Sequence, residues 1–155
     1  MKPTSVLLAA FVGLVFFVLL PFASIKINDF FVLPVISYPV FKAFGLILFL
    51  AGVLLIIYST KLFFILGKGT PVPIEPPKKL VVNGVYKYSR NPIYLSYFLI
   101  FLGYFFFFGH LTLLVYFVLS IIGINLIVAF YEEPILKKRF GKDYKDYLHK
   151  IPRWI

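Results

Sequence analysis

The sequence predicts an all-α, polytopic membrane protein with four transmembrane helices, a C-terminal helical hairpin and an amphipathic interfacial tail. The first observation is composition, because 61% of the 155 residues are apolar, whereas ordinary soluble domains hold about 45–50%. The second is that apolar runs close to the roughly 20 residues needed to cross a bilayer recur along the chain. The third is that no internal repeat divides these runs, so we expect one membrane domain over residues 1–155.

Two apolar runs in the first half predict two transmembrane helices. Residues 5–23 follow a single lysine and resemble a signal peptide, but the run is long and has no clear small-residue cleavage site, which favours a retained helix. Residues 41–66 form the second run. At about 1.5 Å per residue, a helix of this length exceeds the hydrocarbon thickness, so we expect it to tilt or protrude.

The second half contains a loop, a hairpin and a tail. Residues 67–91 are rich in Gly, Pro and Lys and include an Asn-Gly pair typical of a tight turn, so we expect an ordered loop rather than a linker. Apolar sequence then predicts two helices, over residues 92–108 and 111–131, joined by a very tight turn. Residues 132–155 are charged, with apolar residues at three- and four-residue spacing, which predicts an amphipathic helix at the membrane interface.

The distribution of positive charge predicts the topology. Of the 16 Lys and Arg residues, one precedes the first helix, six lie around the second loop and seven lie in the tail. Four crossings place these fourteen residues on one side of the membrane, and the positive-inside rule makes that side cytoplasmic. We therefore expect cytoplasmic N- and C-termini. The excess of 16 basic over 6 acidic residues then needs no nucleic acid to explain it.

Residue content disfavours several kinds of site. The chain has no Cys, which excludes disulfides, thiolate catalysis and cysteine metal sites. Its two histidines lie in different polar segments, His110 between the last two predicted transmembrane helices and His149 in the tail. We therefore expect no metal site.

A polar cluster stands where the second loop meets the third predicted helix, and its members are Tyr86, Arg90, Asn91, Pro92 and Tyr94. One interpretation is structural. Asn91 suits a helix N-cap and Pro92 suits the first helical position, while Arg90 could bind a lipid phosphate. The tyrosines then serve as interfacial anchors. The functional interpretation is that these side chains form part of a ligand site.

Two adjacent acids, Glu132 and Glu133, end the last apolar run. At the C-terminus of a helix they would face the negative end of its dipole, which disfavours anions by about 0.3–1 kcal/mol, so we expect a positive partner. That partner could be Lys137 or Arg139, or the acids could begin a new helix near Pro134. The functional alternative is a cationic ligand, such as an ammonium or a sulfonium.

The two clusters together resemble a known family. The segment "NGVYKYSRNPIYL", a membrane hairpin and the segment "EEPILKKRFGKDYKDYLHKIPRWI" are similar to the isoprenylcysteine carboxyl methyltransferase and phospholipid methyltransferase superfamily. The family pattern is Gly-x-Tyr-x-x-x-Arg-His/Asn-Pro-x-Tyr, followed by Glu-Glu and Phe-Gly-x-x-Tyr-x-x-Tyr. The resemblance covers residues 80–155. Asn91 stands where the eukaryotic carboxyl methyltransferases have His, as it does in many prokaryotic members.

The resemblance implies an integral membrane methyltransferase that uses S-adenosylmethionine. It implies that Glu132 and Glu133 take the ammonium or the ribose hydroxyls of this cofactor, and that Arg90 takes its carboxylate or braces the acids. The expected catalytic residues are Arg90, Asn91 and Glu133. The expected cofactor-binding residues are these three with Pro92 and Glu132, with Leu80, Val81, Gly84 and Tyr86 along the adenine, and with Tyr94, Tyr144 and Tyr147 closing the pocket.

The expected partners are the lipid bilayer and a hydrophobic or lipid-like methyl acceptor that approaches from it. The cofactor supplies the electrophile, so the protein has to position the reactants and exclude water. Two alternatives stay open. One is a membrane reductase that uses a nicotinamide cofactor, as sterol reductases of similar C-terminal architecture do, and the other is a non-enzymatic membrane scaffold.

Overall fold

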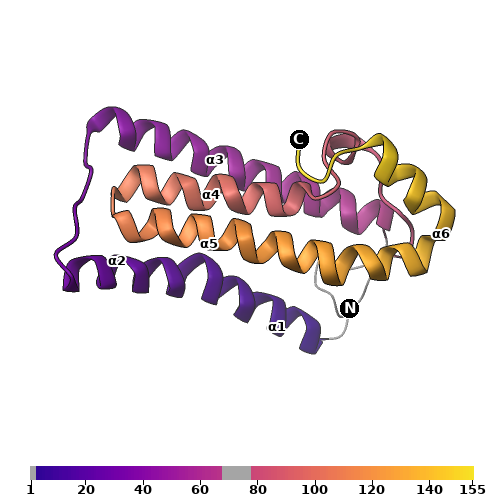
Figure 1. Ribbon diagram of the computed structural model, residues 1–155, viewed down its shortest axis with the longest axis horizontal. Coiled ribbons are helices and arrows are strands. Elements are labelled where there is room, and N and C mark those ends of the chain that lie inside the picture. The colour runs from indigo at the N-terminus through magenta and orange to yellow at the C-terminus, as the bar shows by residue number, and fades with distance from the viewer. Residues whose placement is uncertain (1–2, 68–77) are drawn as a thin grey trace. The chain divides into compact units, whose positions relative to one another are not determined.

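A computed structural model describes residues 3–67 and 78–155 of the chain (Figure 1). These residues are helical except for short connections, and none of them belongs to a β-sheet, which confirms the predicted all-α class. The chain divides into two compact units. Unit 1 holds Met1–Val53 and Tyr97–Ser120, and unit 2 holds Leu54–Ser96 and Ile121–Ile155.

The α-helices are continued or linked by short 3-10 and π segments. In chain order the elements are α1 (Pro3–Leu14), η1 (Val15–Leu19), α2 (Leu20–Phe30), α3 (Pro39–Leu62), η2 (Phe63–Gly67), η3 (Gly84–Lys87), α4 (Pro92–Phe108), α5 (Leu111–Ile127), η4 (Val128–Glu132) and α6 (Glu133–Lys150). Of these, η3 is a 3-10 helix, whereas η1, η2 and η4 are π-helical. Part of the predicted 67–91 loop, residues 68–77, lies outside the described residues.

The first helix is longer than the predicted residues 5–23. α1, η1 and α2 follow one another without a break and end at Phe30. Polar residues near the predicted end are accommodated by hydrogen bonds, because Ser24 Oγ donates to Leu20 O (2.9 Å) and the buried Asn28 donates through Nδ2 to Leu33 O (2.9 Å). These bonds let the helix continue past residue 23.

The π-helical segment η1 is tied to both helices of the hairpin within unit 1. Tyr104 of α4 donates its hydroxyl hydrogen to Phe17 O (2.9 Å), and Tyr116 of α5 donates to Phe16 O (2.7 Å). The ring of Phe17 also packs edge-on against Tyr97, with 4.9 Å between the ring centroids. The first helix is therefore held to the hairpin at its π turn.

Two connections meet at one end of unit 1. α4 and α5 run antiparallel and are joined at Gly109 and His110 (Figure 1). Val35, in the connection after α2, forms an isolated antiparallel bridge with His110, and Ile36 N donates to Gly109 O (2.8 Å). His110 Nε2 also lies 3.3 Å from Asp29 Oδ1. The first connection and the hairpin turn thus lie together, as the predicted topology requires.

Within residues 3–67 and 78–155, three helices are long and apolar enough to cross a membrane, namely Ala10–Phe30, Pro39–Gly67 and Leu111–Lys150. The last of them includes α6, whose charged sequence follows the apolar part that is predicted to cross the membrane. α4 has the predicted bounds, residues 92–108, but its 17 residues make it a shorter apolar helix. A fourth crossing and an interfacial position of the tail remain predictions.

α3 and α4 approach each other closely at Gly45 and Gly103 within unit 1. A Cβ atom at Gly45 would stand 2.6 Å from Phe107 N and 2.8 Å from Gly103 O. A Cβ atom at Gly103 would stand 2.9 Å from both Gly45 O and Phe49 N. These neighbours are backbone atoms that cannot rotate away, so the contact depends on two glycines, as is common between membrane helices.

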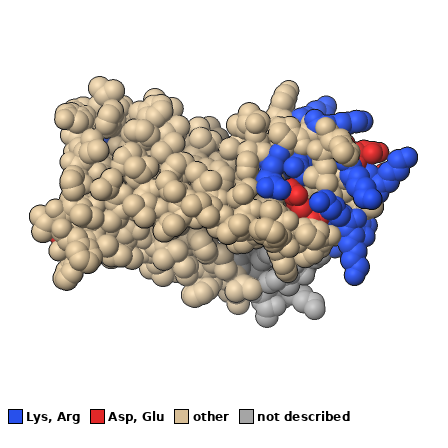
Figure 2. Space-filling view, in the orientation of Figure 1, with Lys and Arg blue, Asp and Glu red and all other residues tan. Residues whose placement is uncertain are grey.

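Unit 2 contains both polar clusters that the sequence analysis singled out. Its core is formed by aromatic and aliphatic side chains from the segment before η3, from η3, from η4 and from α6, and includes Val81, Tyr86, Val128, Tyr144 and Tyr147. Figure 2 shows Lys and Arg side chains gathered over α6 and the segments around it, with acidic side chains among them. α6 is broken at Gly141, where φ is 53° and ψ is −120°.

Candidate functional site

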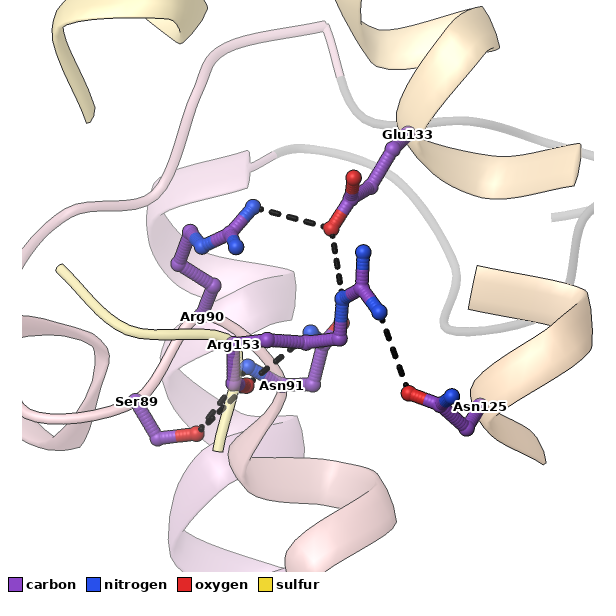
Figure 3. Close-up of polar contacts among 6 residues, drawn as sticks. All are labelled: Ser89, Arg90, Asn91, Asn125, Glu133 and Arg153. Atoms are coloured by element: carbon purple, nitrogen blue, oxygen red, sulfur yellow. Dashed lines mark hydrogen bonds and ion pairs between the residues drawn. The ribbon is translucent and has the colours of Figure 1, made fainter. Parts of the chain in front are cut away.

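The polar cluster of unit 2 centres on Glu133, at the start of α6 (Figure 3). Arg90 Nη1 donates to Glu133 Oε1 at 3.0 Å, and Arg153 Nε donates to the same oxygen at 2.8 Å. Arg153 also donates through Nη1 to Asn125 Oδ1 (3.0 Å). The side chains of Arg90 and Glu133 are only 9% and 8% exposed, so their contact is a largely desolvated, charge-assisted hydrogen bond.

The residues after α6, numbers 151–155, form a segment that we call the C-terminal strap. Arg90 N donates to Pro152 O (3.1 Å). Two side chains donate to the carbonyl oxygen of Arg153, Ser89 through Oγ (3.3 Å) and Asn91 through Nδ2 (3.2 Å) (Figure 3). The strap therefore lies across the residues that lead into α4.

α4 begins at Pro92, as expected for a proline at the first helical position. The residue before it, Asn91, donates its side-chain amide to the strap, a contact that the sequence did not predict. The backbone N–H of Asn91 donates to Ser89 Oγ (3.2 Å). The resemblance assigns the side-chain amide of Asn91 to the cofactor, whereas in the structure this amide binds the strap.

The two adjacent acids have different surroundings. Burial raises the pKa of Glu132, and a hydrogen bond from the Tyr94 hydroxyl offsets only part of that rise. Burial acts in the same direction on Glu133, but the hydrogen bond from Arg153 and the positive charges of Arg90, Arg153 and Lys137 outweigh it and hold the pKa of Glu133 below its usual value. Neighbouring groups whose pKa values are pushed apart are typical of functional sites.

The helix-dipole argument for a cation beside these acids is wrong. α5, η4 and α6 form one continuous helical stretch, Leu111–Lys150, so Glu132 and Glu133 do not stand at a helix C-terminus. Glu133 instead lies in the first turn of α6, next to Pro134. This agrees with the structural alternative in placing the start of α6 near Pro134, but because the stretch is continuous no free helix N-terminus faces the acids.

Three buried tyrosines connect η3 with α3 and α6. The hydroxyl of Tyr147 donates to Tyr86 O (2.6 Å), and the hydroxyl of Tyr86 donates to Ser59 O of α3 (3.4 Å). Burial raises the pKa values of Tyr144 and Tyr147. Tyr144 also lies close enough to Glu133 for the carboxylate charge to add to this rise. The tyrosines thus form a fixed, largely apolar wall at the Arg–Glu cluster.

The remaining predicted residues line the segment before η3. Val81 is buried and Leu80 is half-buried. Gly84 has a φ of 61°, and a Cβ atom there would stand 2.5 Å from Leu62 Cδ1, so glycine allows η3 to lie against α3. No hydrogen bond or ion pair within residues 78–155 joins Leu80 or Val81 to Glu133 or its arginines.

A sequence model of phospholipid methyltransferases matches residues 40–143, more than half of the chain. The chain belongs to the phospholipid methyltransferase family. The comparison with curated proteins found no significant match. The matched region begins in α3 and ends in α6, so it includes both polar clusters, whereas the strap follows it. With long apolar helices among its described residues, this family member is an integral membrane protein.

Sequence reasoning missed three residues of the site in this phospholipid methyltransferase family member, namely Ser89, Asn125 and Arg153. Asn125 carried a usable signal, because an amide inside an apolar helix is often functional. Arg153 carried no such signal, because helical spacing indicates only residues of the same helix as partners for the acids. The partners found that way, Lys137 and Arg139, are exposed, and Glu133 pairs with arginines from outside α6.

The site also holds a buried donor without a partner among the described residues, Arg90 Nε. Leaving such a group unpaired costs about 1–3 kcal/mol. Both guanidinium groups bind Oε1 of Glu133, which leaves Oε2 outside both bonds (Figure 3). An unpaired guanidinium donor and a carboxylate in the same cluster are the groups that a ligand with both a carboxylate and an ammonium group would need.

Proposed function

We propose that the protein transfers a methyl group from S-adenosylmethionine to a hydrophobic or lipid-like acceptor at the cytoplasmic face of the membrane. The observation that carries this proposal is the buried Nε of Arg90, which has no partner among the described residues, on a side chain that binds Glu133 through Nη1, in a member of a methyltransferase family. This pair suits the amino-acid end of the cofactor, with the carboxylate on Arg90 and the ammonium on Glu133.

The charges of the cluster support the same cofactor. Two guanidinium groups, on Arg90 and Arg153, share the carboxylate of Glu133, so these three side chains together retain a positive charge that favours the cofactor's carboxylate. Glu132, which Tyr94 binds, provides a second carboxyl group for the sulfonium or the ribose hydroxyls. The residues present therefore fit a zwitterion with an additional positive centre.

When bound, S-adenosylmethionine supplies the activated methyl group. The protein's residues then bind and orient it. Arg90 and Glu133 would hold its amino-acid end, and the buried rings of Tyr86, Tyr144 and Tyr147 would keep water from the reacting atoms. Orientation of this kind can remove a large part of a barrier, of the order of 7–11 kcal/mol in favourable cases.

We assign the site to the cytoplasmic face because α6 and the segments around it carry most of the positive charge (Figure 2). Unit 2 also presents exposed apolar side chains that suit contact with lipid, for example Ile57 of α3 and Ile122 and Leu126 of α5. A hydrophobic acceptor can therefore approach from the bilayer, while the cofactor enters from water.

Calorimetric titration of the purified protein in detergent tests this proposal. We expect saturable binding of S-adenosylhomocysteine and no binding of the reduced nicotinamide dinucleotide phosphate. Binding of the dinucleotide alone would replace the proposal with a membrane reductase, and binding of neither would favour a scaffold. Incubation with cofactor carrying a labelled methyl group, followed by organic extraction of the membranes, should then reveal the acceptor.

A further inference from the structure

We infer that the C-terminal strap is a working part of the ligand site, in which Arg153 is a positioning residue that keeps Arg90 free to bind the ligand. The inference rests on the proposed function. It adds to the site a segment that lies outside the region matched by the family model. Arg153 acts here through Glu133 and Arg90, not by contact with the reacting atoms.

The strap joins the ends of three helices through two different sets of contacts. Its carbonyl groups accept hydrogen bonds from the residues before α4, and its guanidinium group binds one residue each of α5 and α6. These partners are Ser89, Arg90 and Asn91 for the carbonyl groups, and Asn125 and Glu133 for the guanidinium group (Figure 3). The backbone of the strap thus holds the residues before α4 in place, while the Arg153 side chain holds the carboxylate of Glu133.

Arg153 determines how Arg90 can bind Glu133. Arg90 binds Glu133 through Nη1, at 3.0 Å from Oε1, and Arg153 Nε binds the same oxygen at 2.8 Å. An arginine that has a carboxylate to itself favours two parallel hydrogen bonds. Without Arg153, Arg90 would be free to turn and bind Glu133 through Nε as well. That pairing would consume the donor that the ligand requires.

Arg153 also sets the charge of the cluster. With Arg153 in place, one positive charge is left over after Glu133 has been neutralised. Without it, Arg90 and Glu133 would neutralise each other, and a ligand carboxylate would gain much less from binding. A strap with a merely structural role would change stability but would leave the affinity of the folded protein unchanged.

Arg153→Gln in the full-length protein separates these roles, because it removes the guanidinium group but keeps the carbonyl oxygens that bind Ser89, Arg90 and Asn91. We expect the dissociation constant for S-adenosylhomocysteine to rise at least about tenfold, the loss of one charge-assisted contact. The matched control is Lys150→Gln, which removes the same charge from an exposed side chain and should leave the affinity unchanged. Circular dichroism verifies that each variant is folded.

The pH dependence of binding is a second test, because it would be unchanged if Arg153 had only a structural role. The charged groups that act on Glu133 are Arg90, Arg153 and Lys137, and the titratable side chains beside it are Glu132 and Tyr144. Removing Arg153 should let the pKa of Glu133 rise towards its usual value. As the pH is lowered, Arg153→Gln should therefore lose binding at a higher pH than the wild type does.

Wild-type affinity together with the wild-type pH profile in Arg153→Gln would overturn the inference. If that variant does not fold, Arg153→Lys takes its place, because lysine keeps the charge but cannot bind Glu133 and Asn125 together in the same way. We expect weaker binding, and wild-type affinity in Arg153→Lys would overturn the inference equally. A wild-type protein that binds no S-adenosylhomocysteine would instead overturn the proposed function on which the inference rests.

Discussion

Arg153 and Glu133 form an ion pair across 20 residues of the chain, with 2.8 Å between Arg153 Nε and Glu133 Oε1. The path between them passes a break in α6 at Gly141, where φ is 53°. The pair thus links an acid in the first turn of this helix to a base beyond its last residue. Because the same oxygen binds Arg90, Glu133 is the point at which the start of α4, the start of α6 and the strap meet.

Glu133→Gln should destabilise the ligand-free protein, whereas Glu132→Gln should not. The change at 133 removes the charge that two guanidinium groups share, and each charge-assisted hydrogen bond contributes about 1.5–3 kcal/mol. The change at 132 removes a carboxylate whose ionisation is opposed by burial, so stability should stay the same or rise slightly. Thermal melts in detergent at pH 7 compare the two, and equal effects would contradict different roles for the two acids.

Acid should destabilise the ligand-free protein partly through Glu133. The pKa of this group is lower in the folded than in the unfolded protein, where its ordinary value is 4.5. Its contribution to stability is therefore fully present above that value and is lost as the pH falls through the folded pKa. Between pH 7 and 3 the melting temperature should fall more steeply for the wild type than for Glu133→Gln. Parallel curves would mean that other carboxyl groups cause the loss of stability in acid.

Arg90→Lys should fold but bind S-adenosylhomocysteine at least about tenfold more weakly, because a lysine cannot bind Glu133 through one nitrogen and a ligand through another. Calorimetry measures the difference. Arg139→Lys is the matched control, since Arg139 is exposed and should tolerate the same change. Equal affinities in wild type and Arg90→Lys would favour the simpler role of Arg90 as an anchor for lipid phosphate.

The four-crossing topology predicts which engineered cysteines react from each side of the membrane. Single cysteines at Lys79 and Lys150 should react with an impermeant thiol reagent from the cytoplasmic side, and cysteines at Tyr38 and His110 from the opposite side. The chain has no cysteine of its own, so each label reports one position. Reaction of position 110 from the cytoplasmic side would show that α4 does not cross.

Gly45→Ala should destabilise the protein by about 1–3 kcal/mol, because the added methyl group meets backbone atoms that cannot move aside. Gly123→Ala in α5 is the control. A Cβ atom there has no neighbour within 4 Å, so replacing a helical glycine should stabilise by about 0.4–1 kcal/mol. Reversible unfolding of both variants in mixed micelles, followed by circular dichroism, gives the comparison. A neutral Gly45→Ala would mean that the α3–α4 contact is looser than described.

The sequence predicted α4 with its observed bounds, Pro92–Phe108, because both ends carry local signals. A proline suits the first helical position, and a glycine turn follows the last residue. The end of the first helix could not be predicted in the same way. Ser24 and Asn28 look like the start of a loop, but Thr112 of α5 lies against them and donates to Ser24 O (2.6 Å). Tertiary contacts of this kind have no local sequence pattern.

The pairing of Glu133 with Arg153 also could not be predicted from the local sequence. Helical spacing selects Lys137, four residues ahead, as the partner for an acid at this position. Gly141, however, breaks α6 with a positive φ, and the chain then returns Arg153 to the start of the helix. A glycine permits that conformation but does not require it. Residues beyond such a break cannot be placed from their spacing.

The π turn in the first helix bears on how the protein enters the membrane during synthesis. The carbonyl groups of Phe17 and Phe16 accept hydrogen bonds from Tyr104 and Tyr116, which follow 87 and 100 residues later. In hydrocarbon a carbonyl group without a partner costs several kcal/mol, so a first helix that inserts alone should keep regular α-helical hydrogen bonds. We then expect the π turn to form only when the hairpin arrives beside it. Insertion and final packing would be separate events for this helix, with helices made much later deciding the register of its first half.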